Sequence, residues 1–372
     1  MTCLEPIDCF MPADIDKDGK RRLIFNPSTI NDYILTSDYQ KKYLPDTDFK
    51  LSLDNRHIIL DGSFRSTGLI KGYLIKVPCG KCLGCRNDYA RRWSARCYHE
   101  GVMHDNFKNC AFITFTFNNN MLFKRKNPWS VDKNAFSQWI KRFRERIRYK
   151  YGNDATDIRF FACGEYGSKG SSHRPHYHML LYGFNFPDKY VIRGQGYPKK
   201  LQPRKVGDHV VYNYRSPFLE SCWTPVDSDE SFGFTTISEV NQFTCSYVAR
   251  YVMKKSCNDM FPNREPVFTN SSRRPGIGAS YFDSHYKEMF ALGHIKIGKN
   301  FVSDIPRYYV DRLKNTDLEL YNCYKFDSFH KLVNNFHVDT TSEQLEAKRE
   351  LLIRKLDMYH RSYEEDVDLH NI

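Results

Sequence analysis

The chain has 372 residues, of which 41% are hydrophobic and 15% aromatic, so it can bury a large core and is not a largely disordered protein. Its formal net charge of +12 favours a polyanionic partner such as nucleic acid. No apolar run approaches the roughly 20 residues that cross a bilayer, and the N-terminus lacks a signal-peptide pattern. We therefore expect a nucleic-acid partner, no membrane partner and a cytoplasmic location.

Residues 1–75 combine Pro, Asp and Asn with short apolar pieces, which predicts an irregular or β-rich N-terminal lobe. Next come Cys79, Cys82 and Cys85, three thiols at three-residue spacing with glycines that permit a tight turn. This spacing is typical of zinc ligands, and the alternative is a set of reduced thiols without a metal. Three residues are candidates for a fourth ligand: Cys3, Cys9 and His99. Four more cysteines lie in apolar or periodic segments, where a free Cys usually packs in the core: Cys97, Cys110, Cys163 and Cys245.

The next part of the chain alternates predicted helices and strands. A helix begins near Arg86, because apolar residues recur every four positions among arginines, and a strand covers residues 111–117. Asp132 can cap a second helix. The apolar stripe of that helix is Phe136, Trp139, Ile140, Phe143 and Ile147. We expect strands at residues 158–163 and from His176 onward.

Residues 185–230 are rich in Pro, Gly and Asp and are predicted to be a surface excursion. A strand at residues 232–237 and a helix at residues 239–255 follow. Residues 271–278 form a basic, glycine-bearing loop that can approach phosphates closely or serve as a solvated connector. A charged helix at residues 341–363 comes last. This order predicts an α+β fold with a mainly antiparallel central sheet and helices packed on one face.

His176 and His178 head a strand in which alternate side chains share a face, so both imidazoles point the same way at about 7 Å spacing. Glu165 ends the preceding strand, and a hairpin can bring it beside them, although it can also be a surface residue of the turn. Two neutral nitrogens and a carboxylate suit Mg²⁺ or Mn²⁺ and leave coordination positions for a phosphate oxygen. A histidine pair alone can instead be satisfied by local hydrogen bonds.

Tyr247 and Tyr251 lie four residues apart and share a helix face. Near a bound cation a phenol can form the phenolate that attacks a phosphodiester. The alternative is a pair of core residues, because 25 tyrosines make a chance pair at this spacing common. The histidine strand in the same domain favours the catalytic hypothesis.

Three segments in this order resemble the three motifs of HUH rolling-circle replication initiators: residues 112–117, residues 174–178 and residues 247–254. Within that superfamily the chain is similar to the replication initiators of microvirus-family bacteriophages, gokushovirus branch. The likeness extends to residues 78–86, 164–167, 272–278 and 306–309, and the start at Thr2 and Cys3 is also similar. The combination of motifs is specific, whereas no single motif is.

The resemblance implies a two-tyrosine mechanism on an HUH endonuclease-like fold. His176, His178 and Glu165 would be metal ligands for Mg²⁺ or Mn²⁺, and Glu165 is the weakest transfer because its spacing varies in such enzymes. Tyr247 and Tyr251 would alternate as nucleophiles that nick the viral origin, hold a 5′-phosphate, free a 3′-hydroxyl primer and later close a circular single strand. Double- and single-stranded origin DNA would be the substrate. A host helicase and DNA polymerase would be partners in the bacterial cytoplasm.

We expect five basic residues to contact DNA, although a solvated charged face is also ordinary: Arg250, Lys254, Lys255, Arg273 and Arg274. We expect four cysteines to form the structural zinc site: Cys3, Cys79, Cys82 and Cys85. We predict four segments, namely an N-terminal lobe with the cysteine cluster (1–85), an HUH-like nicking domain (86–260), a basic extension (261–310) and a helical C-terminal tail (311–372).

Two other functions are compatible with the sequence. A conjugative relaxase or a transposase of the same superfamily would share the chemistry, but relaxases usually present three histidines and N-terminal tyrosines. A non-catalytic, zinc-stabilised DNA-binding protein would use the charge and the cysteines and keep the tyrosines in its core. A metal analysis combined with a nicking assay distinguishes the second from a nuclease.

Overall fold

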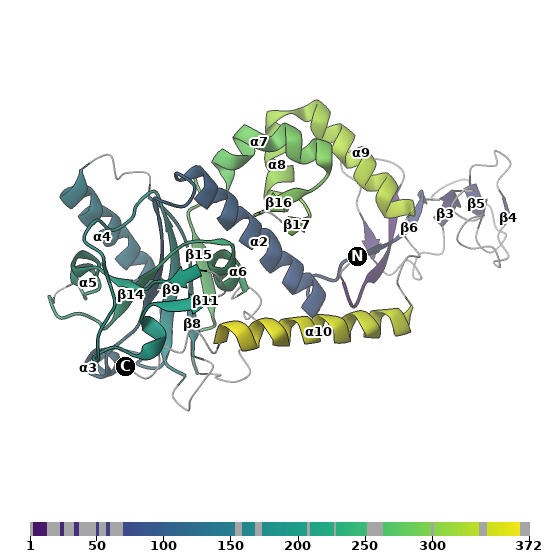
Figure 1. Ribbon diagram of the computed structural model, residues 1–372. Helices are drawn as coiled ribbons and strands as arrows, with labels where there is room; N and C mark the ends of the chain where they lie inside the picture. Colours follow the sequence, from purple (N-terminus) through teal and green to yellow (C-terminus); the bar gives the residue numbers. More distant parts are fainter. Residues whose placement is uncertain are drawn as a thin grey trace. The chain divides into compact units, whose positions relative to one another are not determined.

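A computed structural model describes residues 3–12, 23–25, 33–36, 50–51, 57–59, 70–152, 158–167, 173–206, 209–226, 228–250, 263–298, 301–334 and 341–364 (Figure 1). The chain divides into two compact units, Met1–Arg86 with Asp317–Lys355 and Asn87–Thr316 with Leu356–Ile372. The four segments that we predicted from the sequence stay a prediction about separate domains.

The first unit contains a six-stranded sheet. Its strands are, in spatial order, β2 (Ile24–Phe25), β1 (Ile7–Pro12), β6 (Ile70–Val77), β3 (Tyr33–Thr36), β5 (His57–Ile59) and β4 (Lys50–Leu51). The longest pairing is antiparallel and joins β1 to β6 from Ile7 opposite Val77 to Pro12 opposite Gly72. The prediction of a β-rich N-terminal part is therefore confirmed. Two helices contribute to this unit: α9 (Leu318–Asn334) and the first part of α10 (Ser342–Glu364).

The second unit is built on a seven-stranded sheet in which every pairing is antiparallel. The strands are, in spatial order, β10 (Tyr190–Val191), β13 (Tyr214–Arg215), β14 (Thr235–Ser238), β7 (Cys110–Phe115), β9 (Pro175–Tyr182), β8 (Arg159–Tyr166) and β15 (Phe268–Ser271). The predicted α+β class with a mainly antiparallel sheet is confirmed. The edge strand β15 was not predicted, because Thr269, Asn270 and Ser271 lack the apolar alternation of a buried strand.

Helix α4 (Lys133–Tyr151) covers one face of this sheet as predicted. Asp132 caps it by accepting a hydrogen bond from the backbone N–H of Ala135 at 2.8 Å. Its apolar stripe is buried: Phe136, Trp139, Ile140, Phe143 and Ile147. The stripe packs against the sheet side chains that point to this face, such as Phe115 and Tyr177, and the Tyr177 ring stacks on Phe136 with centroids 4.3 Å apart.

Helices also cover the opposite face, so the expectation of helices on one face is wrong. Helix α2 (Leu83–Met103) and helix α6 (Gln242–Arg250) pack there through Cys97 and Val248 (Figure 1). The physical reason is visible in β9, where all eight residues are buried. A strand that is apolar at every position needs cover on both faces, whereas a strand with one solvated face alternates. The four cysteines predicted to pack as core residues are buried within this layer: Cys97, Cys110, Cys163 and Cys245.

Residues 185–230 are not a simple surface excursion. The short helix α5 (Pro217–Cys222) lies within them, and Ser216 and Asp188 hold its start by accepting backbone hydrogen bonds from Leu219 and Phe218. Five aromatic, aliphatic and thiol side chains of this segment belong to the core beside α4: Phe186, Phe218, Leu219, Cys222 and Trp223. The high Pro, Gly and Asp content marks turns between these anchors rather than a solvated loop.

The remaining elements are short or peripheral to the sheet. They are α3 (Asn119–Lys124), a 3₁₀ turn (Lys199–Leu201), β11 (Arg204–Val206), β12 (His209–Val211), α7 (Ala279–Leu292), β16 (Ile295–Ile297), β17 (Phe301–Ser303) and α8 (Arg307–Thr316). Within the described ranges, no helix combines the length and the apolar character that a membrane crossing requires.

Candidate functional site

The pairing of β8 with β9 brings Glu165 directly opposite His176. His178 lies two residues further along β9 and therefore faces the same side of the sheet. Glu165 Oε1 is 2.6 Å from His176 Nε2 and 3.0 Å from His178 Nε2. The ligand atoms of these three buried residues lie within 4.8 Å of one another, so the group can hold a metal ion. The hairpin that the sequence suggested for Glu165 is present.

Each imidazole is oriented through its other ring nitrogen. His178 Nδ1 lies 2.9 Å from the hydroxyl of Thr114, its direct partner on β7, and His176 Nδ1 lies 3.2 Å from the carbonyl oxygen of Arg174. A carbonyl oxygen accepts a hydrogen bond, so His176 carries its proton on Nδ1 and presents a free electron pair at Nε2. We did not predict Thr114 as part of the site. Its signal is its place in the residue 112–117 motif, on the face shared with Phe112.

The electrostatics of Glu165 suit a cation. Burial by itself raises the pKa of this carboxyl group, but the charges and hydrogen bonds of His176 and His178 outweigh it and lower the pKa to about 2. The group therefore offers one anionic oxygen and two imidazole nitrogens. A carboxylate oxygen favours hard ions such as Mg²⁺ and Mn²⁺, and imidazole adds affinity for later transition metals. Three protein donors leave coordination positions for other ligands, so the residues fit a catalytic divalent cation.

Tyr247 reaches the same site from α6. Its hydroxyl lies 3.4 Å from His178 Nε2, and its ring packs edge-on against His178 at a centroid distance of 5.2 Å. The Arg250 guanidinium group lies over the Tyr247 ring, 5.9 Å from its centroid. The side chain of Tyr247 is buried, so it is at once a core residue and a neighbour of the three-donor group. The predicted partners Tyr251, Lys254 and Lys255 lie outside the described residues.

The basic loop at residues 273–278 is held by hydrogen bonds from its protein side. Arg159, which forms a buried ion pair with Glu100, donates to the carbonyl oxygen of Pro275 at 2.9 Å, and Glu100 accepts from the backbone N–H of Gly278 at 2.5 Å. Arg273 and Arg274 are exposed on this fixed backbone. The loop follows β15, and Ser272 bonds to Phe160, five residues from Glu165 on β8. That separation is roughly 17 Å along the strand, so these arginines do not join the three-donor group.

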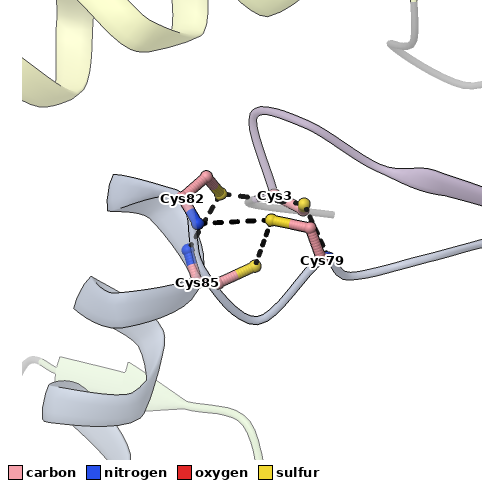
Figure 2. Close-up of side chains that lie close together, drawn as sticks. All are labelled: Cys3, Cys79, Cys82 and Cys85. Atoms are coloured by element: carbon pink, nitrogen blue, oxygen red, sulfur yellow. Dashed lines mark hydrogen bonds between the residues drawn. The ribbon is translucent and has the colours of Figure 1, made fainter.

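The three predicted zinc ligands lie beside a fourth thiol, that of Cys3. The sulfur atoms of Cys3, Cys79, Cys82 and Cys85 all lie within 4.8 Å of one another (Figure 2). The other two candidates have different surroundings. Cys9 packs with Met11 and Ile75 in a separate core cluster of β1 and β6. The ring nitrogens of His99 lie 3.1 Å from the Tyr309 hydroxyl and 2.9 Å from the Lys296 carbonyl oxygen.

Comparison with known proteins gives a consistent picture. Residues 110–256, which include β7, β8, β9 and α6, match the protein family described as Replication-associated protein ORF2. The chain is 30% identical over 245 residues to Replication-associated protein VP4 of Bdellovibrio phage phiMH2K, which covers 65% of this chain and 69% of that protein. It is 26% identical over 264 residues to Replication-associated protein ORF4 of Chlamydia phage 1 (68% and 59% covered). It is also 26% identical over 307 residues to Replication-associated protein ORF2 of Spiroplasma virus 4 (79% and 81% covered). No solved structure matches the chain. The chain therefore belongs to the family of microvirus replication-associated proteins.

Proposed function

We propose that this protein initiates rolling-circle replication by nicking one strand of a duplex viral origin through a tyrosine. It stays attached to the 5′-phosphate, frees a 3′-hydroxyl primer, and later cuts and rejoins the strand to release a circle. The observation that supports this proposal most is the Tyr247 hydroxyl, 3.4 Å from His178 Nε2 in a buried group that can hold a metal ion. Family membership supports the replication role. A host helicase and DNA polymerase are the partners we expect in the bacterial cytoplasm.

The cofactor we propose at Glu165, His176 and His178 is Mg²⁺ or Mn²⁺. When bound, such a cation supplies Lewis acidity to the scissile phosphate and offsets the charge that builds on its oxygens. The chain contributes the arrangement of the donors: Thr114 and the Arg174 carbonyl fix the imidazole rings, and Glu165 supplies a negative charge. A structural zinc at the four cysteines is a separate proposal, because soft thiolates select a different metal.

In the proposed reaction the Tyr247 hydroxyl oxygen forms a bond to the phosphorus atom, and the bond from phosphorus to the 3′-oxygen breaks. The phenol proton is lost and the departing 3′-oxygen gains one, so the step is a transesterification that needs no nucleotide. The phosphodiester bond is exchanged for a tyrosyl ester, which a 3′-hydroxyl can later attack to reseal the DNA. Tyr251, one helical turn further along the sequence, is the proposed second nucleophile.

The test of the nucleophile is a nicking assay on a supercoiled plasmid that carries the phage origin. With Mn²⁺ we expect a nicked circle with protein on its 5′ end, and mass spectrometry of the nuclease-treated adduct should place the phosphate on Tyr247 or Tyr251. Tyr247→Phe should nick through the remaining tyrosine but fail to complete circularisation, and the double change to Phe should abolish the adduct. Tyr149→Phe is the control, since Tyr149 is 95% exposed on α4. An adduct that persists in the double variant contradicts the mechanism.

We propose that Arg273 and Arg274 contact DNA phosphates, because their loop backbone is already fixed and little conformational entropy is lost on binding. Arg250, Lys254 and Lys255 would contact the strand near the tyrosines. Replacing Arg273 and Arg274 with Ala should weaken binding to any duplex and lower the slope of log affinity against log salt by about 1 for each phosphate that the variant no longer neutralises. Fluorescence anisotropy measures this slope, with exposed Lys314→Ala on α8 as the control. An unchanged slope contradicts the assignment.

A further inference from the structure

The four thiols at Cys3, Cys79, Cys82 and Cys85 have the spacing of a tetrahedral metal site. The sulfur atoms of Cys3 and Cys82 are 3.7 Å apart, and those of Cys79 and Cys85 are 4.0 Å apart. Four sulfurs bound to one zinc ion at about 2.3 Å in a tetrahedron would be about 3.8 Å from one another. A disulfide bond would instead hold two sulfurs about 2.05 Å apart, and all four cysteines are free thiols.

The backbone around the thiols points its N–H groups at the sulfur atoms (Figure 2). Cys79 Sγ accepts from the N–H groups of Lys81 and Cys82 at 3.4 and 3.2 Å. Cys82 Sγ accepts from Leu4 and Cys85 at 3.2 and 3.4 Å. Gly80 makes the first turn possible, because its φ of +75° lies in the left-handed region that other residues rarely adopt. These donors stabilise electron-rich sulfur, which is the form that binds a metal.

The surroundings of the thiols point to a structural ion. Cys3 and Cys82 are buried, and apolar side chains of Leu4, Leu83 and Leu352 pack around the cluster. Four protein donors complete the coordination of zinc and leave no position for substrate, which is the arrangement of structural sites rather than catalytic ones. Soft thiolates also select zinc over Mg²⁺ or Mn²⁺.

We infer that these four cysteines bind one structural zinc ion, which fastens the N-terminal residues to the turn between β6 and α2. Cys3 and Cys82 are separated by 79 positions in the sequence, so the ion closes a long loop that contains β1 through β6. Closing a long loop stabilises the folded state by lowering the entropy of the unfolded chain. The inference does not depend on the proposed nicking function.

The test measures metal in the full chain by mass spectrometry, in a His176→Ala/His178→Ala background that removes the second metal-binding group. We expect one zinc ion per chain. Cys82→Ser and Cys3→Ser should each lose it, whereas Cys323→Ser, which changes an exposed thiol of α9, should retain it. Replacement of the zinc by Co²⁺ should give thiolate-to-cobalt charge-transfer bands and the visible bands of a tetrahedral ion. Absence of zinc, stoichiometric iron, or zinc that survives both Ser changes would overturn the inference.

Misfolding of a Ser variant is detected separately. All four tryptophans, at positions 93, 129, 139 and 223, belong to the second unit, so their fluorescence reports whether that unit is folded when zinc is lost. If a Ser variant does not fold, titration of the unaltered protein with a mercurial should release one zinc ion as four thiols react, and release without thiol reaction contradicts the site. Nicking that fails while zinc is retained rejects the proposed function alone, and the converse result rejects the zinc site alone.

Discussion

The two metal-binding groups of this chain are built from different kinds of structure. Glu165, His176 and His178 are placed by the register of two paired strands, and their side chains also bond to one another. The cysteine group is placed by a turn with left-handed Gly80, and its sulfur atoms receive hydrogen bonds from the backbone. One group thus depends on the sheet and the other on a short local segment plus Cys3.

This difference in construction corresponds to a difference in chemistry. Three oxygen and nitrogen donors leave coordination positions for a phosphate oxygen, whereas four thiolates complete a tetrahedron and exclude substrate. A nucleophile candidate, Tyr247, lies beside the three-donor group, while leucines surround the thiols. The comparison therefore assigns exchangeable, catalytic metal to the strands and permanent, structural metal to the turn.

The largest expected effect comes from removing a donor of the three-donor group. His178→Ala should lower the rate of origin nicking by about a thousandfold or more, because metal stabilisation of the scissile phosphate contributes several kcal/mol and each 1.4 kcal/mol is tenfold in rate. The zinc content should not change. Rates follow from gel assays with Mn²⁺, and His294→Ala, at a half-buried histidine near β16, is the control. Normal nicking by His178→Ala, or loss of zinc from it, would remove the distinction between the two groups.

Metal removal separates the groups without mutation. Brief treatment with a chelator such as EDTA should stop nicking completely, and added Mn²⁺ should restore it, while zinc stays with the protein because its four donors are all thiolates of the chain. Nicking and zinc content are measured on the same samples. Simultaneous loss of both, with recovery only when zinc is returned, would indicate that the thiol-bound ion is the one required for cleavage.

The features that the sequence predicted best depend on short-range patterns. The α4 stripe, the β9 strand and the parity of His176 and His178 follow from helix and strand periods, and all three are present. The thiol spacing at Cys79, Cys82 and Cys85 is likewise local, and three of the four ligands were identified from it.

The features that the sequence left open depend on contacts between distant segments. Cys3 could not be chosen over Cys9 and His99, because the choice requires the position of the N-terminal residues beside the turn. Thr114 was missed because its role follows from the pairing of β7 with β9, which periodicity does not specify. The core role of Trp223 was hidden in a segment whose composition resembles a loop.

A smaller effect should follow from changing the support of an imidazole rather than a ligand. Thr114→Val keeps the shape of the side chain but removes the hydroxyl beside His178 Nδ1. We expect the Mn²⁺ concentration for half-maximal nicking to rise by roughly 10- to 100-fold, as for other residues that orient metal ligands. Thr116→Val is the matched control, since the Thr116 hydroxyl bonds to the Phe234 carbonyl instead. An equal shift in both variants would mean that Thr114 acts through strand packing.

The smallest effect concerns the stability of the metal-free second unit. The histidines lower the pKa of Glu165 from 4.5 to about 2, so its ionised form stabilises the fold above pH 4.5 and this contribution is lost as the pH falls toward 2. With chelator at neutral pH, Glu165→Gln should lower the free energy of unfolding by roughly 2 kcal/mol, the scale of a buried charged hydrogen bond. The difference should narrow as the pH approaches about 3.5. Urea titrations followed by tryptophan fluorescence measure it, with Glu145→Gln on the exposed face of α4 as the control. A difference that stays constant over this range would mean that the histidines do not hold the charge of Glu165 in place, and that the three-donor group, like the thiols, needs its metal to be organised.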